Sequence, residues 1–416
     1  MTMTLALTAE RFSHNESDYI SDPFDFYAKM RAEQPAYQSD RVFGGAWLFF
    51  RHADCRHLIR DERLSNNRSD VPLRFLPPDR RVEFDDMVGV LGRWFAFHDG
   101  ESHRRLRRYV HRGYQPLGGE RLHRSIQATV DALLAGLPGD EFDLMSELAF
   151  PLPAIVIADL LGVPAEAHAE LIRWTDDIAQ LLGSTQVTEE FALRARASTE
   201  ELVAFLSSAE SLRSSERQGG LLHAMRAVGG PDDSLDDEDV IAQAALLLFA
   251  GTASIRYLIG NSVRAVDQAP PGAKELLVDP RTAPAAVEEL LRYCNPVQFV
   301  GRVAREDFAY EYDDGRYAEI RAGQPVMLYT ASANRDSDKF PRADELVLTR
   351  PLPNEHLTLG SGLHLCFGDP LVRATTRTAL ATLYTRLPHL RVPDQEIDWN
   401  NNLGFRGPQA LRVVAA

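Results

Sequence analysis

The chain has 416 residues, of which 60 are acidic and 45 basic, so its formal net charge is −15. With 44% hydrophobic residues, it has the composition of an ordinary globular protein and not of a mainly disordered one. The negative charge opposes general binding to nucleic acid or anionic lipid. Three cysteines without a CxxC pair argue against a disulfide framework or a zinc module. The N-terminal region lacks the pattern of a signal peptide, so we expect a cytoplasmic protein with no nucleic-acid or membrane partner.

No repeat or low-complexity linker divides the chain, so we expect a single domain over 1–416 with a flexible tail over 1–18. Apolar spacing of three and four predicts helices over 24–32, 102–114, 120–136, 151–162, 190–207 and 370–384. Alternating or short apolar runs predict strands over 47–50, 298–304, 308–312, 317–321 and 325–329. The fold class is therefore mainly α with small β-sheets.

The clearest helix start is the sequence SLDDEDV at residues 234–240. Ser234 stands three residues before Asp237, as in a capping box, and acidic residues crowd the first turn, where they suit the helix dipole. The following residues, to Val263, are apolar almost all round, which is typical of a buried helix. We expect this helix to form the centre of the fold.

The most informative segment is LGSGLHLCFGDPLVR at residues 359–373, in which three glycines surround Cys366. Glycine allows positive φ angles and close backbone approach. The helix predicted after the cysteine can stabilise a thiolate through its dipole. A lone cysteine is commonly a small buried side chain, but this glycine pattern indicates a loop that holds a ligand.

Residues 360–368 match GxGxHxCxG, and the segment resembles the haem-binding loop of the cytochrome P450 superfamily of haem-thiolate monooxygenases. The resemblance implies the P450 fold, with haem b between the long central helix and the cysteine loop. It also implies that Cys366 is the axial iron ligand, since a thiolate favours O–O cleavage. The family usually has Phe directly before Gly360, where this chain has Leu359. That change can alter packing around the sulfur but not the ligand.

Other motifs extend the resemblance over about residues 20–415. Glu289 and Arg292 match the ExxR element, and we expect Arg350 to close a partly buried network with them. Haem propionates need cationic or hydrogen-bonding partners. The resemblance implies four of them, namely His103, Arg107, Arg302 and His356.

The central helix departs from the AGx(D/E)T stretch of the family, because it contains Ala250-Gly251-Thr252-Ala253-Ser254. The small pair Ala250-Gly251 leaves room for oxygen. Ala253 stands where the family has an acid, and Ser254 stands where it has threonine. The acid and the alcohol normally organise the water that relays protons. The candidate catalytic residues are Ser254, Thr252, Gly251 and Ala250.

Three interpretations of this change are open. In the first, Ser254 and ordered water suffice, and the enzyme is an ordinary hydroxylase. In the second, proton delivery is altered because the reaction is unusual, such as oxidative coupling, ring closure, desaturation or peroxide-driven oxidation. In the third, the chain is a non-catalytic helper, which retention of Cys366 and the propionate partners opposes. Arg256, on the same helix, either binds an acidic substrate or reaches the surface through its long stem.

Candidate substrate contacts are Phe249, Phe299 and Val300, with Phe95 and Phe97 as weaker ones, and they indicate an apolar or aromatic substrate. The chain resembles bacterial members without a fused flavin domain, which take electrons from NAD(P)H through a separate ferredoxin and ferredoxin reductase. We expect natural-product oxidation. A basic docking patch for an acidic ferredoxin is predicted at Arg104, Arg105, Arg108 and Arg112.

Overall fold

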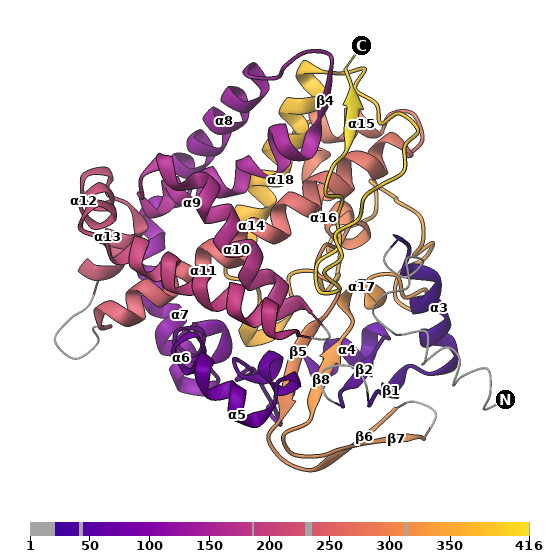
Figure 1. The fold of residues 1–416 in the computed structure, drawn as a ribbon. Helices are drawn as coiled ribbons and strands as arrows, with labels where there is room; N and C mark the ends of the chain where they lie inside the picture. Colours follow the sequence, from indigo (N-terminus) through magenta and orange to yellow (C-terminus); the bar gives the residue numbers. More distant parts are fainter. Residues whose placement is uncertain (1–20, 41–44, 185–186, 229–234, 313–314, 416) are drawn as a thin grey trace.

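The structure is a computed structural model that describes residues 21–40, 45–184, 187–228, 235–312 and 315–415. The expected tail over 1–18 lies outside the described residues. Helices dominate, and most of them lie on one side of α14, with the largest sheet on the other (Figure 1). The helices in chain order are α3 (Phe24–Glu33), α4 (His52–Leu58), α5 (Pro78–Arg81), α6 (Asp85–Gly92), α7 (Gly100–Tyr114), α8 (Glu120–Ala135), α9 (Pro151–Leu161), α10 (His168–Gly183), α11 (Glu189–Ser207), α12 (Ala209–Gln218), α13 (Leu221–Ala227), α14 (Asp237–Asp267), α15 (Ala273–Val278), α16 (Ala283–Tyr293), α17 (Thr330–Ala333) and α18 (Asp369–Arg386).

Short strands build three small sheets in the described part of the chain. The largest has the order β1-β2-β8-β5-β3, in which β2 and β8 pair parallel and the other neighbours pair antiparallel. The pairs β4–β9 and β6–β7 are antiparallel ribbons. The strands are β1 (Ala36–Gln38), β2 (Trp47–Phe49), β3 (Leu64–Ser65), β4 (Glu141–Asp143), β5 (Val300–Ala304), β6 (Phe308–Glu311), β7 (Tyr317–Ile320), β8 (Pro325–Leu328) and β9 (Arg412–Val414).

The predicted elements are confirmed, and their boundaries lie within two residues of those expected except at the end of the central helix, which continues past Val263 to Asp267. Helical periodicity was sufficient for this because most helices bury one apolar stripe against the core. The predicted cap of the central helix differs. Asp236 caps α14, with its carboxylate accepting a hydrogen bond from the Asp239 amide at 2.7 Å. Ser234, the predicted cap, lies outside the described residues.

The central helix α14 is the spine of the domain. Among the described helices, it alone has the length and apolar composition of a membrane span, and 72% of that apolar window is buried inside the protein. Its apolar faces pack against α9, α10, α11, α13 and α18. The apolar character of α14 therefore reflects its place in the core.

A buried network ties α16 to the chain that leads into the cysteine loop, as the ExxR match predicted. Arg292 is fully buried and donates to both carboxylate oxygens of Glu289, at 2.8 and 2.7 Å. Arg350 donates to the same carboxylate at 2.8 Å. Burial acts to raise the pKa of Glu289, but hydrogen bonds from Arg292, the Val347 amide and Arg350 outweigh it and lower that pKa. Each charge in this network has a partner.

Candidate active site

Cys366 lies at a cavity of about 330 Å³ between α14 and the 359–368 loop. Apolar side chains form most of its wall, and polar side chains gather at one part of it. Among the apolar side chains of the wall are Phe95, Phe249, Val297, Val300, Phe367 and Phe405. A cavity that is mostly apolar, with a few convergent polar groups, is the usual form of a small-molecule or cofactor site.

The backbone of the cysteine loop accounts for its glycines. Gly360 and Gly362 both have φ of 75°, in the left-handed region that glycine adopts most easily. The Cys366 amide donates to the Leu359 carbonyl at 2.8 Å, which closes the loop ahead of α18. Burial raises the pKa of the Cys366 thiol, while the Gly368 amide and nearby Arg107 favour the thiolate. The loop thus presents one sulfur to the cavity.

Three arginines, Arg68, Arg107 and Arg302, line the same cavity. Arg302 is 5% exposed, and its guanidinium donates to the carbonyls of Gly301, at 2.8 Å, and Ile59, at 3.4 Å. None of the three guanidinium groups lies within salt-bridge distance of a carboxylate of the described residues. Burial, followed by repulsion from Arg68, lowers the pKa of Arg302 to about 9. This wall therefore carries positive charge that calls for an anionic ligand.

Two stacked imidazoles adjoin the arginines. His103, on α7, and His364 have ring centroids 3.9 Å apart, and His364 lines the cavity. Both ring nitrogens of His103 are buried and lack a hydrogen-bond partner within the described part of the chain. Burial lowers the pKa of His103 to about 4 and that of His364 to about 3. Unpartnered donors, uncompensated guanidiniums and one facing sulfur together fit haem b, which brings two carboxylates and an iron.

His356, the fourth predicted propionate partner, is not among the residues that line the cavity. Its Nε2 lies 3.2 Å from a carboxylate oxygen of Glu288, which also accepts from Arg373. The structure therefore corrects the prediction, because Glu288 holds this imidazole away from the cavity. His364 lines the cavity instead. The histidine inside the GxGxHxCxG motif was the signal that could have identified it.

The central helix presents Phe249, Ala250, Gly251 and Ser254 to the cavity. The Ser254 hydroxyl donates to the Ala250 carbonyl at 3.1 Å. Gly251 has a packing role as well, since a Cβ there would lie 2.1 Å from the side chain of Ile157 on α9.

Thr252 does not share this face of α14. It is buried, and its hydroxyl donates to the Leu248 carbonyl at 2.9 Å. Residues two apart in a helix lie about 200° apart around the axis, so Thr252 and Ser254 cannot both face the cavity. The structure thus corrects the inclusion of Thr252 among the catalytic candidates. Ala253 is also buried and outside the lining.

The predicted substrate contacts divide in the same way. Phe249 and Val300 line the cavity, as does the weaker candidate Phe95. Phe299 is buried in a different cluster, with its ring centroid 5.3 Å from that of Tyr329. Neighbouring side chains in an extended segment point to opposite faces, so Phe299 and Val300 cannot both reach the cavity. Phe299 is therefore not a substrate contact in this structure.

Arg256 fits neither of its two expected roles. It is 5% exposed and does not line the cavity. Its guanidinium forms an ion pair with Asp176 of α10 and lies 4.9 Å from the ring centroid of Phe150. The buried Arg256 therefore links α14 to a half-exposed carboxylate of α10.

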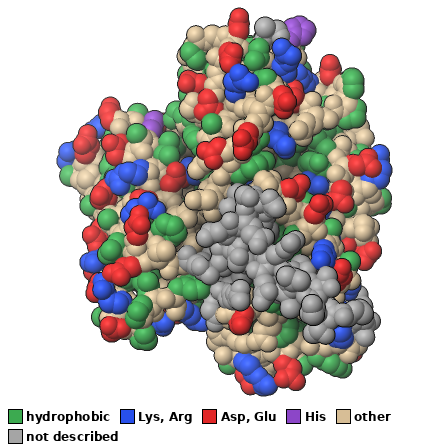
Figure 2. Space-filling model, turned by 45° about the vertical axis from the view of Figure 1, so that its right-hand side comes forward, with side chains coloured by type: hydrophobic (Ala, Val, Ile, Leu, Met, Phe, Trp, Pro, Cys, Tyr) green, Lys and Arg blue, Asp and Glu red, His purple; other side chains and the backbone are tan. Residues whose placement is uncertain are grey.

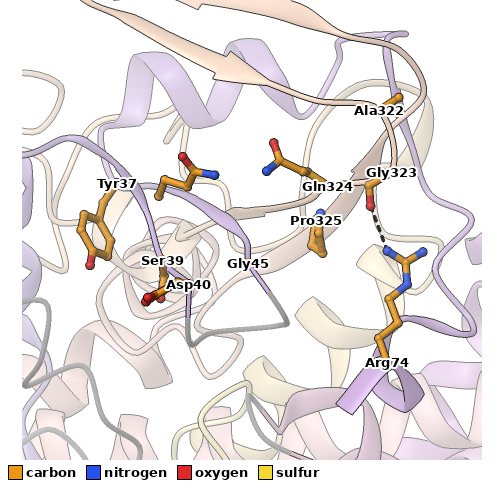
Figure 3. Close-up of a pocket in the computed structure, with 10 residues that line it drawn as sticks. Tyr37, Ser39, Asp40, Gly45, Arg74, Ala322, Gly323, Gln324 and Pro325 are labelled. Atoms are coloured by element: carbon orange, nitrogen blue, oxygen red, sulfur yellow. Dashed lines mark hydrogen bonds between the residues drawn. The ribbon is translucent and has the colours of Figure 1, made fainter. Parts of the chain in front are cut away.

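A second hollow, open to solvent and about 820 Å³ in volume, lies beside β1 and the turn before β8 (Figure 3). Arg74 donates there to the Gly323 carbonyl at 2.9 Å, and Asp40 is the other charged residue of its lining. This hollow holds no group suited to redox chemistry among the described residues. On the face drawn in Figure 2, acidic and basic side chains are interspersed over the part that the structure describes.

A helical fold with a buried thiol facing an apolar cavity, beside a cationic wall, defines the class of haem-thiolate proteins. A sequence model of the cytochrome P450 family matches residues 281–405. The chain is 36% identical over 375 residues to vitamin D(3) 25-hydroxylase of Pseudonocardia autotrophica, covering 89% of this chain and 88% of that protein. It is 31% identical over 405 residues to the biotin biosynthesis cytochrome P450 of Bacillus subtilis, covering 96% and 97%.

The solved structures agree with the sequence comparisons. P450BioI in complex with an acyl carrier protein ligated to hexadec-9Z-enoic acid matches with a TM-score of 0.85 at 28% identity, covering 96% of this chain and all of that one. The chain belongs to the cytochrome P450 family. The predicted fold is confirmed, as is the expectation of a monooxygenase-type oxidoreductase with the family's haem iron cofactor.

Proposed function

We propose that this P450 is a cytoplasmic monooxygenase that oxidises a small, largely apolar or aromatic molecule in natural-product biosynthesis. The observation that carries the proposal is the single sulfur of Cys366 at an apolar cavity with three uncompensated guanidiniums. When bound, thiolate-ligated haem supplies the redox chemistry that activates dioxygen. Cys366 would hold its iron, and Arg107, Arg302, His103 and His364 would hold its propionates.

The substrate would lie against the apolar part of the wall. Phe249 and Val300 come from α14 and β5, and Phe405 approaches Phe249 with a centroid distance of 6.5 Å. These rings exclude water and favour an apolar ligand. Two relatives are named as a vitamin D(3) 25-hydroxylase and a mycinamicin IV hydroxylase/epoxidase, and their names support the proposal of a small organic substrate for this chain.

Ser254 is the proposed proton-holding group. Its hydroxyl donates to the Ala250 carbonyl, so the lone pairs of Oγ remain able to accept a hydrogen bond from water or from substrate. Position 253 faces away from the cavity, so the missing acid leaves the cavity wall itself unchanged. This geometry favours the ordinary hydroxylase over the atypical enzyme.

Electrons would come from NAD(P)H through a ferredoxin reductase and an acidic ferredoxin. The proposed docking patch is on α7, at Arg104, Arg105, Arg108 and Arg112. Arg104 and Arg108 both approach Glu101, at 3.0 and 3.8 Å, which reduces the net charge of the patch. We expect measurable but salt-sensitive docking.

The reduced-CO difference spectrum tests the proposal. Wild-type protein should give the thiolate-type band, and Cys366→Ser should abolish it. Cys55→Ser and Cys294→Ser are matched controls, since both thiols are buried elsewhere, and they should retain it. A screen of apolar and aromatic compounds by Soret shift then identifies ligands. A thiolate-type band in Cys366→Ser would refute the ligand assignment.

The atypical enzyme, which uses peroxide or couples and cyclises its substrate, is the second candidate because Ala253 replaces the acid. Ala253→Asp separates the two. For a hydroxylase, the substitution should keep or improve the yield of product per NAD(P)H. For the atypical enzyme, it should impair the native reaction or divert it towards hydroxylation. Product formation by wild type with peroxide alone, at the rate seen with ferredoxin, would also favour the atypical enzyme.

A further inference from the structure

Arg68 is a cavity residue that none of the sequence motifs indicates. It follows β3 in the chain and lines the cavity together with Arg107 and Arg302. Its Nη1 donates to the Asn66 carbonyl at 3.2 Å, and its guanidinium carbon lies 4.7 Å from the ring centroid of Phe97. No carboxylate of the described residues is within salt-bridge distance. Its charge is thus left without an anionic partner from the protein.

Arg68 reaches this position by crossing β5 at a glycine. A Cβ on Gly301 would lie 3.2 Å from Cδ and 3.3 Å from Nε of Arg68, closer than most side-chain contacts. Both guanidiniums line the same cavity, and repulsion from Arg68 contributes to the lowered pKa of Arg302, so the two cations are neighbours in the cavity wall. Any side chain at position 301 would press on Arg68, so the glycine permits this pairing of cations.

The nearest carboxylate does not neutralise the pair. Asp99 accepts hydrogen bonds from Ser65 and Asn66, and it forms an ion pair with Arg305 at 2.8 Å. Burial lowers the pKa of Arg68 to about 10, with only partial compensation from Asp99. Two neighbouring cations in a partly buried wall repel each other unless an anion lies between them.

We propose that Arg68 binds a carboxylate in this cavity, together with Arg302. The inference rests on the proposed function, because the carboxylate favoured by the geometry is a propionate of the haem that Cys366 would ligate. Arg68, Arg302 and His364 all line this cavity, which places Arg68 in the cluster proposed for the propionates. The carboxylate of an acidic substrate has the same chemistry and is the other source.

Haem retention and redox potential test the propionate. Arg68→Gln should release haem to apomyoglobin roughly tenfold faster, the size expected for loss of a hydrogen bond to a charged group. It should also lower the midpoint potential of the iron, because a nearby cation favours the reduced state. Arg68→Lys should keep most of the potential but release haem at an intermediate rate, since it lacks the planar fork. Gly301→Ala should shift both quantities in the direction of Arg68→Gln.

Arg74→Gln is the matched control. Arg74 lies six residues along the same segment, lines only the open hollow of Figure 3 and should leave both quantities unchanged. Soret titration with dodecanoate and its methyl ester tests the alternative that the carboxylate belongs to an acidic substrate. Weaker binding of dodecanoate alone in Arg68→Gln, with normal haem release, would assign the carboxylate to the substrate.

The inference would be overturned if both Arg68 variants kept the wild-type rate of haem release, the wild-type midpoint potential of the iron and the wild-type affinity for dodecanoate. The thiolate-type CO band of the wild type distinguishes that result from failure of the proposed function. If the band forms and depends on Cys366, the proposed function stands, whatever Arg68 does. Arg68→Lys also keeps the test decisive if Arg68→Gln does not fold.

Discussion

Two groups of buried arginines in this protein differ in how their charge is matched. Arg292 and Arg350 surround one carboxylate, Glu289, and Arg292 also donates to backbone carbonyls of Asn334 and Ala343 at 2.7 Å. Arg302 and its neighbours in the cavity wall have no carboxylate within salt-bridge distance in the described chain. Leaving a buried charge unpaired costs several kcal/mol. A group of buried arginines whose charges are paired with a carboxylate therefore indicates a structural role. A group without a paired carboxylate indicates a site for an anionic ligand.

The largest expected effect is on the satisfied network. Arg292→Met leaves the buried Glu289 with fewer partners and should lower the free energy of unfolding by about 3–5 kcal/mol. Arg281→Met is the control, since Arg281 forms an exposed ion pair with Asp279, and its loss should leave the free energy of unfolding nearly unchanged. Urea unfolding of the holoprotein measures both. Equal costs would remove the distinction between the two groups of arginines.

The next effect concerns the apolar side of the cavity. Ser254→Ala should reduce the rate of coupled product formation about 10²-fold, the lower end for general acid catalysis, and increase peroxide release. Thr252→Val removes a hydroxyl from the opposite side of the same helix and should leave coupling unchanged. The amounts of product and of peroxide formed per NAD(P)H consumed measure the coupling of each variant. Normal coupling in Ser254→Ala would mean that water or the substrate supplies the proton.

The unsatisfied arginines should affect haem binding and not protein stability. Arg302→Leu and Arg107→Leu should each release haem roughly 10- to 100-fold faster, since loss of a hydrogen bond to a charged group costs about 1.5–3 kcal/mol. Unfolding of the apoprotein should stay the same or become harder, because removal of an uncompensated cation relieves repulsion. Haem transfer to apomyoglobin measures the rate of haem release, and Arg104→Leu is the control. Unchanged haem release in both variants and in the double variant would refute the assignment.

The smallest effect is a pH dependence of the apoprotein. His103 and His364 have pKa values of about 4 and about 3, below the value near 6.5 of an unfolded chain. The unfolded chain therefore binds more protons below about pH 6.5, and apoprotein stability should fall as the pH falls towards 4. His103→Phe should reduce this slope. Thermal unfolding between pH 7.5 and 5 measures it, and a flat profile in the wild type would contradict the burial of these imidazoles.

The predictions that succeeded depended on short-range patterns. The period of apolar residues located the helices because each buries one stripe. The glycines around Cys366 predicted a tight loop, and Gly360 and Gly362 have the positive φ angles that few other residues adopt. The ExxR match held because Glu289 and Arg292 lie three apart on one helix and meet without help from the rest of the fold.

The predictions that failed depended on where a side chain points. Phe299 and Thr252 were assigned to the cavity by their positions in the sequence. The backbone geometry instead directs each side chain away from the cavity, although Val300 and Ser254 nearby do line it. His356 was assigned without regard to Glu288, which is distant in sequence from it and holds its imidazole.

The sequence by itself determined the family, the helical fold class and the long apolar helix, and it gave Cys366 as the proposed iron ligand, because each depends on contiguous residues with their own local preferences. Only the tertiary structure decided which distant residues share the cavity. It brought Arg68 across Gly301 to Arg302, stacked His364 on His103 and paired Arg256 with Asp176. The physical reason is that these contacts join segments of the chain that packing of the whole core brings together, and no local pattern records them.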